Sequence, residues 1–503
     1  MPMRTLNRIH LLALTAAACW FSLLEADPAA PFVRQPFASW SQTPPMGWNS
    51  YDSYHAAITE TQFKAVVDVL ADRLLPHGYE YAVIDFLWYH PGPQGWDAEK
   101  DWHTWRAQAF RDPGTGRVIP MLTLDEYGRP MPALNRFPSA EGGKGLRPLA
   151  DYVHAKGMKF GIHLMRGIPT EAVEANRPLR GTGYRLGEVA EIGDTSSFLS
   201  GMFTGVNVDH PGAAAWYDDL FQLYADWGVD YVKVDDMLRP PYHAREIELM
   251  RRAIDRTGRP MVLSLSYGET PVSQAAHLVG HANLWRVSSD FWDRWTDLRR
   301  NFDLLYMWTP FAGDGTWPDA DMIPIGRLML TGWEFSGAEN LNRTKGRNER
   351  EDNFTPDERQ TLMTLWAIAR SPLMWGGDPL TSPESTFALL TNDEVLAVNR
   401  SGRNPRQILG HSHRDDTLRI WISDADEDGA RNVALFNLRD EPSEVKFNLK
   451  WEEMPGAWSV RNLWTHQDEK VVERELAREL PPHGSAFFRL EPVGNATGHE
   501  KHR

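Results

Sequence analysis

Short apolar runs and longer amphipathic segments alternate along residues 46–400. Turn residues bound the apolar runs, which predict β-strands, whereas the amphipathic segments repeat apolar side chains at helical spacing. Strands alternating with helices are typical of a parallel sheet, and eight such units close into a TIM barrel. The predicted strands are 46–51, 81–88, 159–165, 231–235, 261–266, 283–288 and, less clearly, 321–325 and 373–376; predicted helices include 61–75, 145–156, 213–227, 245–257 and 356–370.

The pattern changes after Asn399 to short alternating runs separated by turn residues. Such runs predict an antiparallel β-sandwich. We therefore expect an α/β fold in which a (β/α)8 barrel, residues 31–400, precedes a C-terminal β-sandwich, residues 401–492. The expected linker is 401–416, the expected disordered tail is 493–503, and an insertion at about 89–125 follows the second strand.

The N-terminal residues have the pattern of a secretory signal. Arg4 and Arg8 precede an apolar stretch at 11–24, which is shorter than the about 20 residues needed to span a bilayer. We expect residues 1–30 to be a signal peptide and the protein to be secreted or periplasmic. Cys19, the only cysteine, follows this run as the lipidated residue of a lipoprotein would, so a lipid anchor is the alternative. No intrachain disulfide can form, and no transmembrane span is expected.

Composition narrows the class of partner. The 503 residues suffice for two domains, and the net charge of −15 disfavours a nucleic-acid ligand. The 21 tryptophans suit either a large core or stacking on sugar rings.

Two acids follow predicted strands at the end where TIM barrels carry their chemistry. Asp235 ends the strand 231–235, and Asp290 follows the strand 283–288. Retaining glycosidases need two carboxylates about 5–5.5 Å apart. Each aspartate alone also fits a helix cap or a solvated loop residue.

Other polar and aromatic residues are predicted at the same rim. Lys233 faces the same side as Asp235 and would favour its ionised form, unless the two are only a structural pair. Asp85 ends the second strand, where it could accept sugar hydroxyls. Trp48 and Trp317 are rim candidates that fit the core equally well.

These residues stand in motifs that resemble glycoside hydrolase family 27, the α-galactosidase and α-N-acetylgalactosaminidase family. The motifs are Pro44-Pro45-Met46-Gly47-Trp48-Asn49-Ser50, Tyr231-Val232-Lys233-Val234-Asp235, Arg286 with Asp290, and the segment 317–322. The resemblance implies a retaining double displacement without metal or cofactor.

By the same resemblance Asp235 is the nucleophile and Asp290 the acid/base. Lys233 and Arg286 would contact hydroxyls, Asp85 would accept from the 4- and 6-hydroxyls, and Trp48 would wall the pocket, with Trp317 a further binding candidate.

The chain departs from the family pattern at two expected binding positions. Phe86 stands where a second acid is usual, and His163 where a tyrosine is usual. Phe86 removes an acceptor for the axial 4-hydroxyl that distinguishes galactose from glucose, which weakens the expectation of galactose specificity. Beside the 6-position, Phe86 would favour L-arabinopyranose, which is galactose without its exocyclic CH2OH. His163 fits a hydroxyl contact or a packed strand residue.

The expected function is exo-acting release of terminal α-D-galactose. β-L-Arabinopyranosides, α-N-acetylgalactosaminides and α-glucans remain alternatives, as does a non-catalytic carbohydrate-binding protein. A cofactor enzyme is disfavoured because no Gly-rich phosphate loop and no His/Glu cluster at metal-ligand spacing is evident. The insertion, with Trp96, Trp102 and Trp105, would form either an outer subsite or a packed lid.

Overall fold

The computed structural model describes residues 35–91, 122–195, 201–331, 349–408, 417–425 and 429–494. The predictions for the signal peptide 1–30, for Cys19, for most of the insertion and for nearly all of the tail lie outside these residues. Among the described residues, no helix has both the length and the apolar character needed to cross a membrane.

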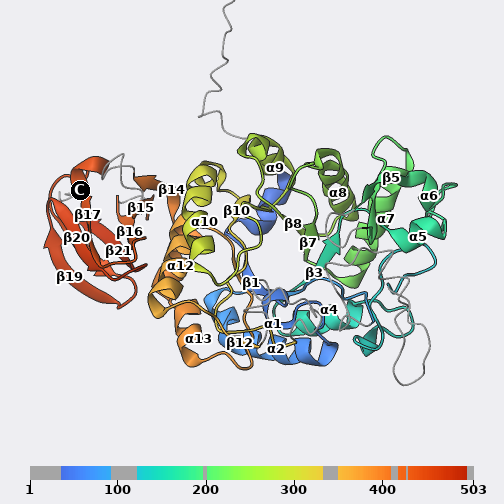
Figure 1. Ribbon diagram of the computed structural model, residues 1–503, viewed down its shortest axis with the longest axis horizontal. Helices are drawn as coiled ribbons and strands as arrows, with labels where there is room; N and C mark the ends of the chain where they lie inside the picture. The colour runs from blue at the N-terminus through green and yellow to red at the C-terminus, as the bar shows by residue number, and fades with distance from the viewer. Residues whose placement is uncertain are drawn as a thin grey trace, which may run out of the picture. The chain divides into compact units, whose positions relative to one another are not determined.

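Eight parallel strands form the barrel sheet, in the order β10-β9-β8-β7-β3-β2-β1-β13 (Figure 1). A parallel bridge between Ile323 and Trp375 links the chain after β10 to β13 and so joins the two edges. The predicted (β/α)8 barrel is confirmed. The strands are β1 (Met46–Asn49), β2 (Tyr81–Ile84), β3 (Lys159–Met165), β7 (Tyr231–Asp235), β8 (Val262–Leu265), β9 (Leu284–Arg286), β10 (Trp317–Asp319) and β13 (Leu373–Trp375).

Helices follow the strands around the outside of the barrel (Figure 1). Where a helix was predicted, its bounds agree with the predicted range to within about two residues at each end, whereas α9 and α10 had no predicted range. They include α2 (Glu60–Arg73), α4 (Arg147–Ala155), α7 (Gly212–Trp227), α8 (Ala244–Thr257), α9 (Ala275–His281), α10 (Trp295–Trp308) and α12 (Pro356–Ala369).

The seventh barrel strand lies earlier in the chain than predicted. Residues 321–325 were expected to be extended, but β10 is Trp317–Asp319. Asp321 has a φ of 89°, in the left-handed region, so the chain turns there and only Ile323 bridges Trp375. The second strand is also shorter than predicted, because Leu87 has a φ of 64°.

A small antiparallel sheet interrupts the barrel between β3 and α7, and the sequence pattern did not predict it. It contains β4 (Ile168–Pro169), β6 (Phe203–Val206) and β5 (Ala190–Thr195), in that order. Two short helices accompany it, α5 (Thr170–Glu174) and α6 (Leu186–Val189). The barrel therefore carries an insertion after its third strand as well as the predicted one after its second.

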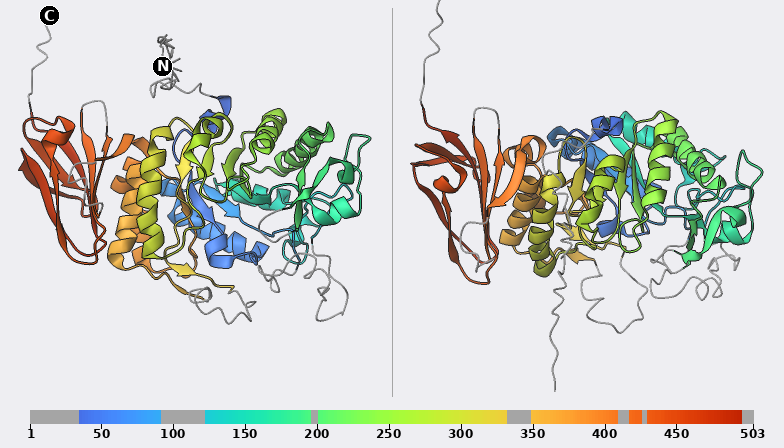
Figure 2. Two further views of the ribbon diagram at one scale, coloured as in Figure 1. Left: turned by 45° about the horizontal axis from the view of Figure 1, so that its top comes forward. Right: turned by 90° about the horizontal axis from the view of Figure 1, so that it is seen from above.

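The C-terminal strands form the predicted antiparallel sandwich (Figure 2). One sheet has the order β14-β15-β16-β21-β18-β19, and β17 pairs with β20 in another. Apolar side chains from both sheets, such as Ile422, Val433 and Phe447, share one core. The strands are β14 (Arg403–Ile408), β15 (Leu418–Asp424), β16 (Arg431–Asn437), β17 (Ser443–Asn448), β18 (Trp458–Asn462), β19 (Gln467–Val472), β20 (Glu475–Leu480) and β21 (Ser485–Pro492).

The expected linker is partly wrong, because residues 403–408 form β14, which pairs with β15. The sandwich also packs against the barrel through α12. Gln360 Nε2 donates to the carbonyl of Ser485 at 2.8 Å, and Thr361 Oγ1 donates to that of His483 at 2.7 Å. The two domains are therefore in direct contact and are not joined only by a flexible linker.

Candidate active site

Alternate residues of β7 face the inside of the barrel, and the polar ones lie toward its carboxyl end. Tyr231 belongs to an apolar cluster contributed by several barrel strands, Lys233 lies one layer above it, and Asp235 ends the strand. Along β2, Tyr81 and Val83 belong to the same apolar cluster, and Asp85 follows them just beyond the strand. The apolar layer thus supports a polar layer at the strands' carboxyl ends, as in other TIM barrels.

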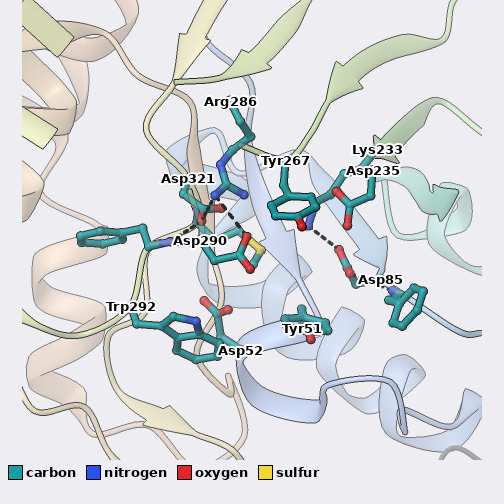
Figure 3. Close-up of a pocket in the computed structure, with 13 residues that line it drawn as sticks. Tyr51, Asp52, Asp85, Lys233, Asp235, Tyr267, Arg286, Asp290, Trp292 and Asp321 are labelled. Atoms are coloured by element: carbon teal, nitrogen blue, oxygen red, sulfur yellow. Dashed lines mark hydrogen bonds and ion pairs between the residues drawn. The ribbon is translucent and has the colours of Figure 1, made fainter. Parts of the chain in front are cut away.

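A pocket with about 490 Å³ of empty space opens above this polar layer (Figure 3). Six predicted site residues line it, and two of them are the expected catalytic pair, Asp235 and Asp290. The lining residues are Tyr51, Asp52, Asp85, Phe86, Lys233, Asp235, Tyr267, Arg286, Asp290, Phe291, Trp292, Asp321 and Met322.

Asp235 is a carboxylate held in its charged form. Its side chain is 18% exposed, and its Oδ2 lies 2.9 Å from His163 Nε2. Burial alone raises the pKa of Asp235, but the neighbouring His163 and the positive charge of Lys233 outweigh it and hold that pKa well below its usual range. An acid that is ionised at every working pH is suited to nucleophilic attack.

Lys233 and Asp85 form a buried ion pair beside Asp235. Lys233 Nζ lies 2.9 Å from Asp85 Oδ2, which also accepts from Asn49 Nδ2 at 2.7 Å. Burial lowers the pKa of Lys233, but the charges of Asp85 and Asp235 outweigh it and raise that pKa above its usual value. Both side chains are therefore charged and held in place by their partners.

Asp290 has a different environment, because its side chain is 59% exposed. Its Oδ1 lies 3.5 Å from Arg286 Nη2. The same Nη2 lies 2.5 Å from Oδ2 of Asp321, which is buried. Asp290 is therefore a lining residue that solvent can reach.

Asp321 is a functional candidate that the sequence analysis missed. Burial, opposed by Arg286 and reinforced by the charge of Asp290, raises the pKa of Asp321 to about 7. Asp321 Oδ2 also accepts from the backbone N–H of Phe291 at 2.8 Å, so it anchors the residue next to Asp290. The segment 317–322 was noted as a motif, but only Trp317 was singled out from it.

Asp52 is a second buried carboxylate in the lining that was not predicted. Burial first, and then the charge of Asp321, raise its pKa well above the usual value. Its Oδ2 has no hydrogen-bond partner among the described residues. A protonated Asp52 is therefore available to donate a hydrogen bond.

Trp48 and Trp317 do not line the pocket, contrary to expectation. Trp48 is fully buried, packs on Phe63 of α2 and donates from Nε1 to the carbonyl of Gly377 at 2.7 Å. Trp317 is equally buried, and its Nε1 donates to the carbonyl of Ser41 at 2.8 Å. Each tryptophan is a core residue, as the alternative interpretation of the sequence allowed.

Tyr51, Tyr267 and Trp292 provide aromatic lining instead (Figure 3). Tyr51 directly follows the motif that ends at Ser50, which was the available signal for it. His163 is absent from the lining and fully buried, and it contacts Asp235 rather than facing the pocket. Its placement is that of a residue that positions a carboxylate.

Family models match both domains of the chain. Residues 179–337 match the model described as alpha galactosidase A, and residues 415–490 match the alpha galactosidase C-terminal beta sandwich domain. A curated relative, alpha-galactosidase 3 of Arabidopsis thaliana, is 28% identical over 90% of this chain and 82% of its own length.

Solved structures give a higher similarity. A family 27 β-L-arabinopyranosidase from Geobacillus stearothermophilus is 43% identical, covers 91% of this chain and 98% of its own, and has a TM-score of 0.82. A putative α-N-acetylgalactosaminidase from Bacillus halodurans is 36% identical over 89% of this chain and 97% of its own, with a TM-score of 0.75. On this similarity across both domains, the chain belongs to glycoside hydrolase family 27 and is a retaining glycoside hydrolase.

Proposed function

We propose that this enzyme removes terminal β-L-arabinopyranosyl and α-D-galactopyranosyl groups, with arabinopyranosides as the better substrates. The two sugars share the configuration of every ring carbon, and they differ in the exocyclic CH2OH of galactose. Curated relatives are named α-galactosidases, and a structural relative is a β-L-arabinopyranosidase, which supports both activities.

In this proposal Asp235 attacks the anomeric carbon while Asp290 protonates the leaving oxygen. The bond to the leaving group breaks as the ester bond to Asp235 Oδ forms. Asp290 then takes a proton from water, whose oxygen attacks the same carbon from the opposite face and releases Asp235. Two inversions give overall retention, and the exposure of Asp290 suits both of its roles.

The remaining polar residues hold the sugar. The paired Lys233 and Asp85 offer a donor and an acceptor to ring hydroxyls, and Arg286 offers further donors on the other side of the pocket. Because these charges are already fixed by Asn49 and Asp321, little reorganisation accompanies binding.

Phe86 is the observation that carries the preference for arabinopyranosides. It lines the pocket directly after Asp85, and its ring packs edge-on against His163, with centroids 5.3 Å apart. An apolar ring in place of a carboxylate cannot accept a hydrogen bond from the 6-hydroxyl of galactose. Asp85 is then the acceptor that the 4- and 6-hydroxyls must share, and a hydroxyl that lacks a full partner against an apolar wall costs about 1–3 kcal/mol.

The ratio of kcat/KM for p-nitrophenyl β-L-arabinopyranoside and p-nitrophenyl α-D-galactopyranoside tests this preference. We expect the wild type to favour the arabinoside and Phe86→Asp to shift the ratio toward the galactoside at least tenfold, about 1.4 kcal/mol. Phe86→Leu, which keeps the wall apolar, serves as the control and should shift it much less. A wild type that favours the galactoside, or an unchanged ratio in Phe86→Asp, contradicts the proposal.

For the N-terminal residues we propose export with removal of residues 1–30, with lipidation at Cys19 as the alternative. The basic residues, the apolar stretch 11–24 and the single cysteine support export. The mass of the mature protein from an exporting host distinguishes the outcomes. A chain that keeps its first residues contradicts export, and a diacylglycerol adduct on Cys19 supports the lipoprotein.

A further inference from the structure

A histidine–carboxylate cluster lies on the outside of the barrel, apart from the residues that line the pocket. His277 and His281 stand four residues apart on α9, and Glu248 comes from α8. One potential ligand atom from each side chain lies within 4.8 Å of the other two. No such cluster was expected from the sequence, because Glu248 is distant in the chain and only the packing of α8 on α9 brings it to the histidines.

Hydrogen bonding prepares His281 to bind a metal. Its Nδ1 lies 2.7 Å from the backbone carbonyl of His277. A carbonyl can only accept, so Nδ1 carries the proton and Nε2 keeps its lone pair. Metal-binding histidines are typically oriented by this kind of bond from the other ring nitrogen.

His277 is prepared in a similar way. Its Nδ1 lies 2.7 Å from the hydroxyl of Tyr242, which can accept the Nδ1 proton. Its Nε2 is buried without a hydrogen-bond partner among the described residues.

The spacing suits a small ion. Glu248 Oε1 lies 3.6 Å from His277 Nε2, close to the about 3.4 Å between two ligands that are each about 2.1 Å from a tetrahedral zinc. Two imidazoles with one carboxylate form a donor set that zinc favours over magnesium or calcium, which prefer oxygen ligands.

In a second cluster of potential ligands, an arginine takes the place that an ion would occupy. Asp194, His243 and Glu246 also converge, but Arg166 Nη1 lies 2.7 Å from Asp194 and 2.9 Å from Glu246. That guanidinium already supplies the positive charge. In the cluster of Glu248, His277 and His281, Arg252 Nη2 lies 3.4 Å from Oε2 of Glu248, whereas the other oxygen, Oε1, faces His277.

We propose that Glu248, His277 and His281 bind one Zn²⁺, with water in the fourth position, and that the ion cross-links α8 to α9. Because the three ligands come together only in the folded chain, bound zinc stabilises the enzyme against unfolding.

Titration of chelator-treated, full-length enzyme with ZnCl₂ at pH 7.5 tests the site. We expect one ion per chain at micromolar affinity, and a rise of at least about 2 °C in the unfolding temperature at saturation. Co²⁺ in its place should give the intense visible absorption of a tetrahedral ion.

His281→Ala and Glu248→Gln should each weaken Zn²⁺ binding at least tenfold and abolish the thermal shift. His466→Ala, which removes an exposed histidine of the sandwich, is the matched control and should bind as the wild type does. Absence of stoichiometric binding, equal affinity in His281→Ala, or an equal loss in His466→Ala overturns the proposal.

Discussion

Asp321 is a buried carboxyl in the pocket whose raised pKa makes the unfolding free energy of the protein depend on pH. Its raised pKa, about 7, means that the folded enzyme keeps a proton that the unfolded chain releases near pH 4. Stability therefore falls as pH rises from about 4 to about 7, where the unfolded state binds fewer protons.

We predict that Asp321→Asn removes this part of the pH dependence. The unfolding free energy of the wild type should fall, relative to that of the variant, between pH 4.5 and pH 7.5. Urea unfolding of both proteins at the two pH values measures this difference. A difference that is the same at both values would show that Asp321 is ionised throughout the range.

The pocket residues that were predicted correctly from the sequence lie on barrel strands or directly beside them. Lys233, Asp235 and Arg286 belong to barrel strands, and alternation alone predicts their direction. Tyr51, Asp321 and Trp292 lie beyond strand ends, where one dihedral angle, such as the positive φ of Asp321, redirects the chain. Trp48 was misplaced because a tryptophan on a strand can equally well face the helices, and it packs on α2.

At the scale of elements, the start of α12 is the clearest agreement between sequence and structure. Thr355 accepts from the backbone N–H of Glu358, whose side chain bonds back to Thr355, and Pro356 occupies the first turn. In the sequence these residues are Thr355-Pro356-Asp357-Glu358, a cap followed by a first-turn proline and two acids. In contrast, β10 could not be placed because it has only three residues, including Pro318.

Loss of this cap should cost about 1 kcal/mol of unfolding free energy. We predict that Thr355→Ala lowers the urea midpoint accordingly without changing kcat/KM, because Thr355 does not line the pocket. Thr296→Ala, at an exposed threonine of α10, is the control and should change stability by less than half as much. Equal effects of the two substitutions would contradict the role of the cap.

For the whole molecule, the barrel and the sandwich share one continuous core. Phe302 of α10 packs edge-on against Phe436 of β16, with centroids 4.9 Å apart, and Trp295 stacks on His483 at 3.7 Å. Trp421 and Phe487 of the sandwich belong to the same apolar cluster as the barrel. The sequence predicted two domains but not this interface, because nothing in a linear pattern marks which faces meet.

The shared core predicts that both domains unfold together. Calorimetry of the chelator-treated enzyme should give a single transition, and Phe436→Ala should lower its temperature without splitting it. Two resolved transitions in the wild type would contradict a common core.

The central claim is that Asp235 carries the sugar as a covalent ester, with Asp290 as its acid and base. Without Asp290, an activated dinitrophenyl glycoside still reacts with Asp235, because its leaving group needs no proton, but hydrolysis of the ester loses its base. The glycosyl-enzyme should therefore accumulate in Asp290→Ala.

Peptide mass spectrometry of acid-quenched Asp290→Ala, incubated with the dinitrophenyl arabinopyranoside or galactoside, measures this directly. The account predicts one glycosyl group on the peptide that contains Asp235, and none when Asp235→Asn is added to the same variant. An adduct on another residue, or none while the substrate is still turned over, would contradict the account.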